Sequence, residues 1–224
     1  GRAVLEDVSI HLREGELVSL LGVSGGGKTT LFNIISGLLR PDSGQILLDG
    51  REITGKPGNI SYMLQKDLLL PYYTTLHNVA LPLIIKGEKK KEAYKKAKEL
   101  FPFFGLEGTE KKFPHQLSGG MRQRAAFLRT YLSSEGVALL DEPFSALDSI
   151  TKTAIHQWFL GIMKEINLSV LFITHDIDEA ILLSDRVYIL SGKPGRITDE
   201  IKIDLPEIRD SSLSFTEDFI KYKK

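Results

Sequence analysis

The sequence predicts an α/β fold with a helical segment inserted into it. An apolar strand over residues 17–21 runs directly into a glycine-rich stretch, and a helix-like segment over 31–39 follows. Towards the C-terminus, apolar runs alternate with helical stretches, which is the pattern of an α/β sheet. These runs span residues 137–140, 170–173 and 187–190. Between residues 88 and 104 the composition shifts to Lys, Glu, Ala and Leu, which predicts the helical insertion.

Turn and capping signals predict the remaining elements. Pro and Gly residues over 40–44 predict a turn, and strands are expected after it over 45–49 and 59–63. Helices are expected over 119–132 and 155–166. The N-terminal part is therefore strand-rich, and the middle of the chain is helical.

Length and charge fit one medium-sized enzyme domain. The 224 residues are 42% hydrophobic, which suffices for a single core. Lys+Arg and Asp+Glu both number 29, so the net charge is zero. The chain lacks the excess of positive charge that is typical of a nucleic-acid-binding protein. The absence of cysteine excludes disulfides, zinc-thiolate sites and thiol catalysis, and it favours a reducing, cytosolic compartment.

Nothing in the sequence predicts a membrane span. No apolar run approaches the roughly 20 residues that cross a bilayer, and no signal peptide is recognisable. A membrane role would therefore come through a partner. The chain opens on Gly1 rather than Met, which indicates processing or truncation. A lysine cluster is expected to form a solvated helix face rather than a membrane contact. It comprises Lys89, Lys90, Lys91, Lys95, Lys96 and Lys98.

A complete P-loop lies between the first strand and its helix. Its glycines let backbone N–H groups point at phosphate oxygens, and the helix that starts there adds the positive end of its dipole. Lys28 is expected on the β- and γ-phosphates and Thr29 on Mg²⁺. The strand before the loop and the helix after it disfavour the alternative, a glycine-rich turn without a ligand. The residues expected to bind nucleotide here are Gly22, Val23, Ser24, Gly25, Gly26, Gly27, Lys28, Thr29 and Thr30.

Two carboxylates follow the apolar run over 137–140. They stand at the C-terminal end of a buried strand, where α/β sheets bind ligands. Asp141 suits the Mg²⁺ shell, and Glu142 suits the base that orients or deprotonates the attacking water. Alone, an acidic pair before Pro143 would be read as the end of a strand, but the P-loop reverses that preference.

A second helix start is also suited to phosphate. Ser118 is a good N-cap, and Gly119 and Gly120 leave the backbone N–H groups after it unshielded. Either the chain binds two anions, or one nucleotide is sandwiched between the P-loop of one copy and this segment of another. A two-fold dimer would satisfy the second option twice.

These motifs resemble those of the ABC ATPases, whose signature motif is LSGGQ. Residues 117–121 read LSGGM, with Met121 in place of the Gln, and the resemblance covers essentially the whole chain. It implies one ABC ATPase domain over 1–224, a P-loop NTPase with a mixed core sheet, an N-terminal antiparallel β part and an inserted helical subdomain. Residues 1–65 and 134–224 would form the nucleotide-binding core, and 66–133 the helical signature subdomain.

The resemblance also implies the cofactors and the remaining site residues. The cofactors would be ATP and Mg²⁺, and Ser118, Gly119 and Gly120 would contact the γ-phosphate of ATP held by the opposite subunit. Residues 145–148 match the D-loop, Gln65 the Q-loop glutamine and His175 the switch histidine.

Taken alone, both of these side chains are weak signals. Gln65 follows a strand and could bind Mg²⁺ or water, although a lone Gln is usually a surface residue. His175 lies just past the apolar run over 170–173, at the same sheet edge as Asp141, where it could hydrogen-bond a γ-phosphate. A lone His there would more often be structural. The combined pattern makes Glu142, Gln65 and His175 the catalytic candidates, and Thr29, Gln65 and Asp141 the metal ligands.

The function that follows is that of the ATPase subunit of an importer, peripheral to the cytoplasmic face of the cell membrane. Two copies, as a homodimer or paired ATPase subunits, would close around two ATP molecules and act on two permease subunits, with an extracytoplasmic substrate-binding protein involved indirectly. The apolar, aromatic segment 68–73 would receive the permease, although core packing is an equal alternative. Within the family, the segments around Gln65 and His175 are similar to the nitrate, sulfonate and taurine group, which includes thiamine-precursor importers. Tyr72 stands where that group typically has Trp.

Two other functions are weaker candidates. A soluble ABC ATPase acting on nucleic acid or ribosomes would carry long coiled-coil insertions or a second cassette, and the neutral charge disfavours nucleic acid. A non-catalytic nucleotide-binding scaffold would have lost Lys28, Glu142 or His175, and all three are present. The adenine-stacking aromatic residue of the family is expected upstream of Gly1, and the transported substrate is not encoded in this subunit.

Overall fold

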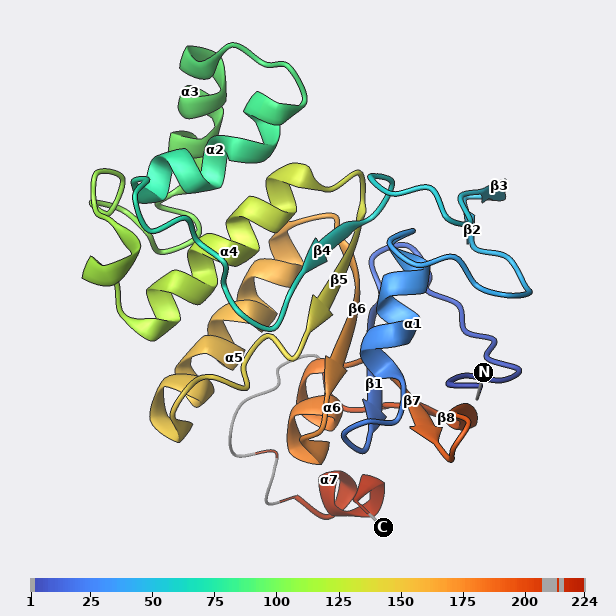
Figure 1. Cartoon of the computed structure of the whole chain (residues 1–224). Helices are drawn as coiled ribbons and strands as arrows, with labels where there is room; N and C mark the ends of the chain where they lie inside the picture. The colour runs from blue at the N-terminus through green and yellow to red at the C-terminus, as the bar shows by residue number, and fades with distance from the viewer. Residues whose placement is uncertain (1–2, 207–212, 214–215, 224) are drawn as a thin grey trace. The chain divides into compact units, whose positions relative to one another are not determined.

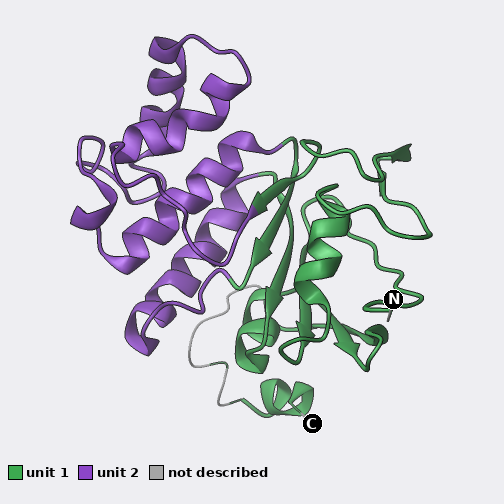
Figure 2. Ribbon diagram, viewed as in Figure 1, with its two compact units in different colours: residues 1–62, 135–142, 167–224 green, residues 63–134, 143–166 purple. Residues whose placement is uncertain are grey.

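The computed structural model describes residues 3–206, 213 and 216–223. The chain forms two compact units, shown in green and purple in Figure 2. Unit 1 comprises residues 1–62, 135–142 and 167–224, and unit 2 comprises residues 63–134 and 143–166. The division of the chain into a core and a helical subdomain at residues 65/66 and 133/134 stays a prediction.

A six-stranded sheet in the order β4-β5-β6-β1-β7-β8 forms the centre of unit 1 (Figure 1). Its strands are β1 (Leu17–Gly22), β4 (Ser61–Met63), β5 (Val137–Asp141), β6 (Ser169–Thr174), β7 (Arg186–Ser191) and β8 (Arg196–Lys202). β1 pairs in parallel with both β6 and β7, and β5 pairs in parallel with β6. β8 is antiparallel to β7, so the sheet is mixed, as predicted.

The parallel strands are buried, as their continuous apolar runs predict. Leu20 pairs with Ile173 of β6 and with Tyr188 of β7, and all three residues are fully or almost fully buried. Neighbouring residues of a strand point to opposite faces of a sheet. On β7, Tyr188 accordingly joins the core beneath α1 (Lys28–Ile35), whereas Val187 joins the one beneath α6 (Ile177–Leu183).

The N-terminal β part is small. β2 (Leu47–Leu48) and β3 (Arg51–Glu52) form an antiparallel pair, which confirms an antiparallel element here. The turn between them places Asp49 and Gly50 at positive φ, 48° and 76°. The strands predicted over 45–49 and 59–63 are therefore both shorter, since only 47–48 and 61–63 pair.

A buried ion-pair network ties β7 to the segment before β1. Arg186, 4% exposed, donates to both carboxylate oxygens of Glu16 at 2.9 and 2.7 Å and to Glu200 Oε1 at 2.7 Å. It also donates to the Tyr188 hydroxyl at 2.7 Å and to the His11 carbonyl at 2.9 Å. Burial opposes the charge of Glu16, but the hydrogen bonds and charge of Arg186 outweigh it, and the pKa of Glu16 is lowered.

Unit 2 is helical. It contains α2 (Thr75–Ile85), α3 (Lys90–Leu100), a 3₁₀ turn (Pro114–Gln116), α4 (Gly119–Ser133) and α5 (Ser149–Glu165). α3 and α4 lie where the sequence predicts them, whereas α2 was not predicted. Aromatic side chains pack its interior: Phe127 lies 5.3 Å from Phe159 and 5.9 Å from Trp158 between ring centroids.

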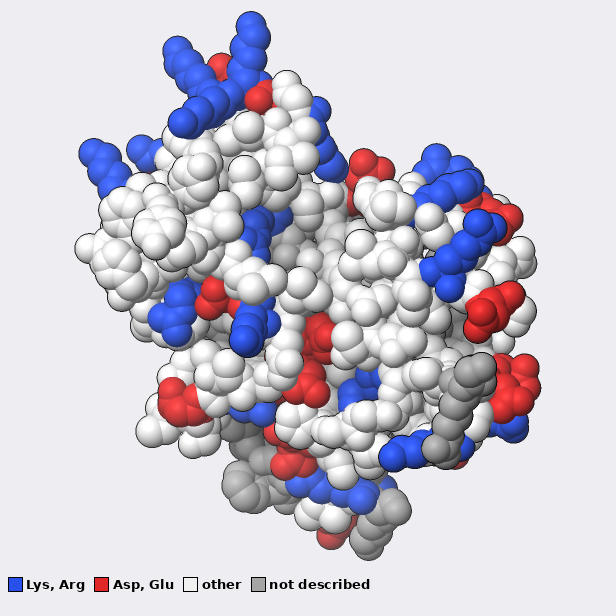
Figure 3. All heavy atoms as spheres, viewed as in Figure 1, with Lys and Arg blue, Asp and Glu red and all other residues white. Residues whose placement is uncertain are grey.

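On the face of the molecule shown in Figure 3, blue side chains gather over α3. The lysines of the predicted cluster are exposed, and the buried residues of α3 are Ala93 and Ala97. This arrangement is that of a solvated helix face. Among the residues described, no helix combines the length and the apolar character that crossing a membrane requires.

Candidate functional site: the P-loop and the ends of β5 and β6

The P-loop links the end of β1 at Gly22 to the start of α1 at Lys28. Gly27, the N-cap of α1, has φ 97°, a conformation that L residues with a Cβ rarely adopt. A Cβ there would also stand 2.8 Å from the Leu5 side chain. The glycine therefore allows the chain to enter the helix with its first backbone N–H groups exposed, as the predicted phosphate site requires.

Lys28 is held over this loop. Its ammonium group donates to the carbonyl oxygens of Gly22 at 2.7 Å and Val23 at 3.0 Å, and the residue is 6% exposed. Burial lowers the pKa of Lys28, while the charges of Glu142 and Asp141 act in the opposite direction. A partly desolvated ammonium group at the start of a helix is suited to a phosphate anion.

Thr29 and Asp141 meet, as predicted for a shared metal site. The Thr29 hydroxyl lies 3.2 Å from Asp141 Oδ2, although the two residues are 112 positions apart in the sequence. Burial raises the pKa of Asp141 and the charge of Glu142 raises it further, against the hydrogen bonds and the charge of Lys28 that lower it. A carboxylate whose negative charge is destabilised in this way would gain from a cation.

Tyr62 is a site residue that sequence reasoning missed. Its hydroxyl donates to the same Asp141 oxygen at 3.3 Å. Burial, together with the charge of Asp141, raises the pKa of Tyr62, so the hydroxyl keeps its proton. The ring packs edge-on against Phe32 of α1, with 5.9 Å between centroids. The sequence predicts the strand over 59–63 that carries Tyr62, but it contains no signal for the contact with Asp141.

Glu142 and His175 form a second pair at this edge. Glu142 Oε1 lies 3.3 Å from His175 Nδ1, and their side chains are 16% and 56% exposed. Both residues follow directly after parallel neighbours, β5 and β6. The Glu142 N–H donates to the carbonyl of Ile173 at 3.1 Å, so the backbone of β6 fixes where this carboxylate emerges.

Local backbone geometry positions both residues. Glu142 has φ 45°, in the left-handed region that is uncommon for a residue other than glycine. Beyond His175, the Asp176 side chain caps α6 by accepting from the backbone N–H groups of Asp178 and Glu179. The Asp176 N–H donates to the Thr174 hydroxyl at 3.0 Å. The turn that carries His175 is therefore hydrogen-bonded on its C-terminal side.

The other predicted residues belong to unit 2. Ser118 is the N-cap of α4, and its hydroxyl accepts from the Met121 N–H at 3.2 Å. Gly119 and Gly120 open the helix, where an added Cβ would meet Leu147 at 3.3 Å and Thr151 at 3.4 Å. This is the helix start that the sequence predicts for a second phosphate contact.

Gln65 is exposed and opens a loop that is fixed at its far end. Asn78 of α2 is fully buried, and its side-chain oxygen accepts from the Leu70 N–H at 2.6 Å. Its amide nitrogen donates to the carbonyls of Leu70, Tyr73 and Thr74, each at 3.1 Å. The loop nevertheless keeps apolar groups on the surface, since Tyr72 is 91% and Leu68 51% exposed.

The P-loop, the Thr29–Asp141 contact and the Glu142–His175 pair at the edge of a mixed α/β sheet define a P-loop nucleoside triphosphatase. A sequence model described as "ABC transporter" matches residues 5–145, and the chain belongs to that family. It is an ATP-binding and ATP-hydrolysing member of the family, as predicted.

Individual relatives agree with this assignment. The formylaminopyrimidine import ATP-binding protein ThiZ of Halalkalibacterium halodurans is 48% identical over 92% of this chain and 80% of its own length. The aliphatic sulfonates import ATP-binding protein SsuB of Bacillus cereus is 41% identical, over 96% and 84% respectively. These similarities confirm the predicted resemblance to the importer group. They give no support to action on nucleic acid or ribosomes.

A solved structure shares the fold. It is a dimeric, post-hydrolysis state of the ATP-binding cassette MJ0796 bound to ADP and Pi. Its TM-score is 0.75 at 34% identity, and the match covers 91% of this chain and 92% of that one. The predicted fold class, a P-loop NTPase of the ABC ATPase type, is confirmed.

Proposed function

We propose that this chain is the ATPase subunit of an ABC importer, in which two copies hydrolyse Mg-ATP and act on separate permease subunits. The contact between Glu142 and His175 carries the catalytic part of the proposal. The import subunits ThiZ and SsuB support the importer role.

In this proposal the P-loop binds the triphosphate. The backbone N–H groups of residues 22–30 and the ammonium group of Lys28 bind the β- and γ-phosphates. Lys28 exchanges the carbonyls of Gly22 and Val23, which it now contacts, for phosphate oxygens. The loop is thus shaped for the anion before the anion binds.

Thr29 and Asp141 fit Mg²⁺. A hydroxyl and a carboxylate within 3.2 Å of each other are hard oxygen donors, and Mg²⁺ commonly takes only one or two protein ligands beside phosphates and water. The Tyr62 hydroxyl keeps Asp141 oriented through its 3.3 Å contact. When bound, Mg²⁺ neutralises phosphate charge. The family resemblance makes Gln65 a further proposed ligand.

Glu142 orients or deprotonates the attacking water. His175 lies in contact with its carboxylate and donates a hydrogen bond to the γ-phosphate. The positive φ of Glu142 fixes the direction in which its carboxylate leaves β5. ATP hydrolysis at this edge of the sheet then depends on the correct positioning of Glu142, His175 and the attacking water, and it needs no covalent intermediate.

A second copy completes each site. Ser118, Gly119 and Gly120 contact the γ-phosphate bound by the partner subunit, through the N-terminus of a 15-residue helix. The dimeric state of the similar cassette MJ0796 supports this pairing. Two such sites in a two-fold dimer would close and open together.

The loop from Gln65 to Tyr73 serves the permease. Its exposed apolar side chains suit a helix of a membrane subunit, and Gln65 at its start senses the nucleotide site. The chain then works at the cytoplasmic face of the membrane, and the extracytoplasmic substrate-binding protein acts on it through the permease.

The variant Glu142→Gln tests hydrolysis and pairing together. We expect phosphate release to fall by about a hundredfold or more, and a dimer to accumulate in Mg-ATP on size-exclusion chromatography. Glu99→Gln, the same change at an exposed position on α3, is the matched control and should behave as wild type. Normal turnover in Glu142→Gln would refute the base assignment. Loss of turnover without a dimer would refute the pairing.

A further inference from the structure

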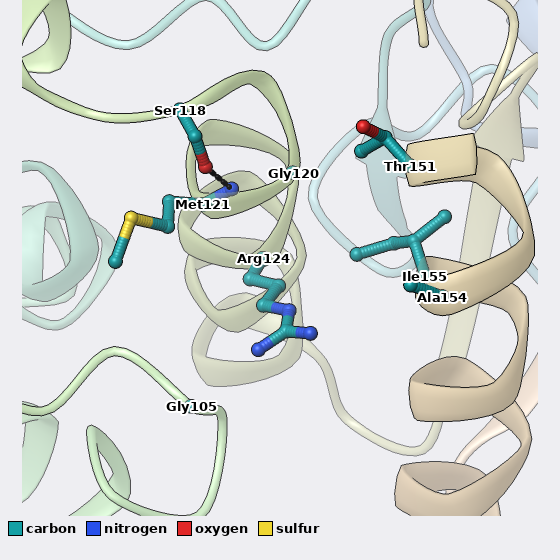
Figure 4. Close-up of a pocket in the computed structure, with 8 residues that line it drawn as sticks. All are labelled: Gly105, Ser118, Gly120, Met121, Arg124, Thr151, Ala154 and Ile155. Atoms are coloured by element: carbon teal, nitrogen blue, oxygen red, sulfur yellow. Dashed lines mark hydrogen bonds between the residues drawn. The ribbon is translucent and has the colours of Figure 1, made fainter. Parts of the chain in front are cut away.

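A pocket of about 290 Å³ lies within unit 2, between the first turns of α4, the first turns of α5 and the loop after α3 (Figure 4). Its lining residues are Gly105, Ser118, Gly120, Met121, Arg124, Thr151, Ala154 and Ile155. Of these residues, only Ser118 and Gly120 belong to the proposed nucleotide contact. The rest of the pocket has no part in ATP hydrolysis as proposed above.

Arg124 supplies the charge of this pocket, and it is held in place. Its guanidinium stands over the indole ring of Trp158, 4.9 Å from the centroid. A Cβ at Gly105 would lie 2.4 Å from Nη1 of Arg124, so the glycine makes room for the guanidinium. In Figure 4 the side chain reaches from α4 towards the Gly105 loop.

This cation is partly desolvated and has no counter-charge among the described residues. Burial lowers the pKa of Arg124, and no acidic side chain offsets that effect. Within the part of the chain that the structure describes, its guanidinium has neither an ion pair nor a hydrogen-bond acceptor. Arg186 of unit 1, by contrast, contacts two carboxylates. A partly buried guanidinium with all five N–H groups available is a ready binder of a planar oxyanion.

A second donor beside it is also unsatisfied. The indole Nε1–H of Trp158 is buried and finds no acceptor among the described residues. Buried polar groups are rarely left unpaired in proteins, and each exception calls for an explanation. Trp158 does not line the pocket, so Arg124 is the charged donor that a ligand there would meet, with the indole ring behind it.

The remaining walls determine the rest of the ligand. Met121, Ala154 and Ile155 are apolar, and Ile155 extends from α5 towards α4 in Figure 4. No lining residue is acidic, so nothing repels an anion. The volume is near the lower end of the roughly 300–1,000 Å³ of small-molecule pockets, which suits a ligand of few atoms.

We propose that this pocket binds a small organic carboxylate. The carboxylate pairs with the guanidinium of Arg124, whose fork of N–H groups matches a planar carboxylate, and a short alkyl body packs on Met121 and Ile155. The site is separate from the P-loop, but it shares Ser118 and Gly120 with the proposed contact to the partner subunit's ATP.

Trp158 makes the test direct, because it is the only tryptophan of the chain. Sodium hexanoate is titrated into the nucleotide-free protein at constant ionic strength, and tryptophan fluorescence is recorded. We expect a saturable change with Kd on the order of 1 mM, as suits a ligand of few atoms. Neutral 1-hexanol, which has the alkyl chain without the charge, should produce no saturable change.

Two variants remove the binding in different ways. Arg124→Gln removes the cation, and Ala154→Glu places a carboxylate on the exposed pocket wall, where it competes for Arg124 without disturbing the core. Each should weaken hexanoate binding at least about tenfold. The matched controls are Lys95→Gln, which loses an exposed charge on α3, and Thr153→Glu, which adds a carboxylate one residue outside the pocket. Both should bind as wild type.

The following outcomes would overturn the proposal. No saturable change in the wild type, or equal binding of hexanol, overturns the proposal. Wild-type affinity in Ala154→Glu overturns it as well, and this variant decides the matter if Arg124→Gln does not fold. Weakened binding in Thr153→Glu would show a general charge effect and would also overturn it.

Discussion

Glu142 Oε1 lies 3.3 Å from Nδ1 of His175, across the C-terminal ends of two neighbouring parallel strands. The two side chains can therefore act on one water molecule and one phosphate as a unit. Residues that act as a unit give non-additive losses when they are changed together.

A double-mutant cycle measures this coupling. Glu142→Gln and His175→Ala should each lower ATP turnover by about a hundredfold or more, because each removes one partner of the pair. The double variant should be little slower than the slower single variant. Steady-state phosphate release at saturating Mg-ATP measures all three. Losses that multiply would show that the two residues act independently.

The hydroxyl of Thr29 should determine the Mg²⁺ requirement. Thr29→Val keeps the shape of the side chain but removes the oxygen that lies 3.2 Å from Asp141, so the Mg²⁺ concentration for half-maximal turnover should rise by about tenfold or more. Thr29→Ser keeps the oxygen and should resemble the wild type. An unchanged Mg²⁺ dependence in Thr29→Val would contradict the proposed ligand role.

The Glu16–Arg186 pair should stabilise unit 1 in a pH-dependent way. Glu16→Gln leaves a buried guanidinium with half of its counter-charge, and the free energy of unfolding at pH 7 should fall by about 3 kcal/mol. Because the pKa of Glu16 is lowered on folding, its stabilisation is full above the ordinary value of 4.5 and is lost as pH falls through the folded pKa. Urea unfolding of wild type and variant should therefore converge in acid.

Glu200 provides the matched control. It pairs with the same guanidinium at 2.7 Å, but its side chain is 45% exposed. Glu200→Gln should cost clearly less than Glu16→Gln, since solvent screens the pair. Equal losses for the two variants, or a loss in Glu16→Gln that persists unchanged below pH 4.5, would contradict the account.

Asn78 should fix the loop that precedes α2. Asn78→Ala leaves the Leu70 N–H without its partner and three backbone carbonyls without this donor, and it should cost about 2 kcal/mol or more. Amide hydrogen exchange over residues 68–75 should accelerate, with the P-loop unchanged. Asn59→Ala, at a half-buried residue whose amide donates to the Lys56 carbonyl at 2.9 Å, is the comparison. Unaltered exchange in Asn78→Ala would show that other contacts hold the loop.

Tyr72 should matter for the permease and not for ATP. The side chain is 91% exposed, so Tyr72→Asp should fold normally and hydrolyse ATP as wild type when isolated. Co-purification of permease subunits from solubilised membranes should fall several-fold, because a charge replaces an apolar contact. Lys66→Asp, also exposed and close in sequence, is the control. Recovery of ribosomes or DNA instead of permease would refute the importer role.

The elements that the sequence predicts well are those with a local signal. β1, β5 and β6 are continuous apolar runs, and the residues that follow them belong to one sheet edge by the rules of parallel sheets. The positions of Lys28, Glu142 and His175 in the fold could therefore be predicted without a structure. The sequence motifs and the positions of the predicted strands together were sufficient to locate these three residues.

The elements that were missed lack such a signal. β8 is largely exposed and polar, so its pairing with β7 is invisible in its composition. α2 begins soon after the apolar loop and contains Pro82, which blurs its periodicity. Tyr62 reaches Asp141 only because distant segments come together, 79 positions apart. Contacts of this kind are properties of the packed chain rather than of any segment of it.

The central position of β1 also has a consequence for synthesis on the ribosome. Val18 is made early, but its partners Leu171 and Arg186 stand on strands that are translated much later. At roughly 5–20 residues per second, the interval is on the order of ten seconds or more. Until then the nascent P-loop is attached to an unpaired, apolar strand. A ribosome that stalls before β6 would release a chain that exposes this strand, a substrate for chaperones and proteases rather than a partial ATPase.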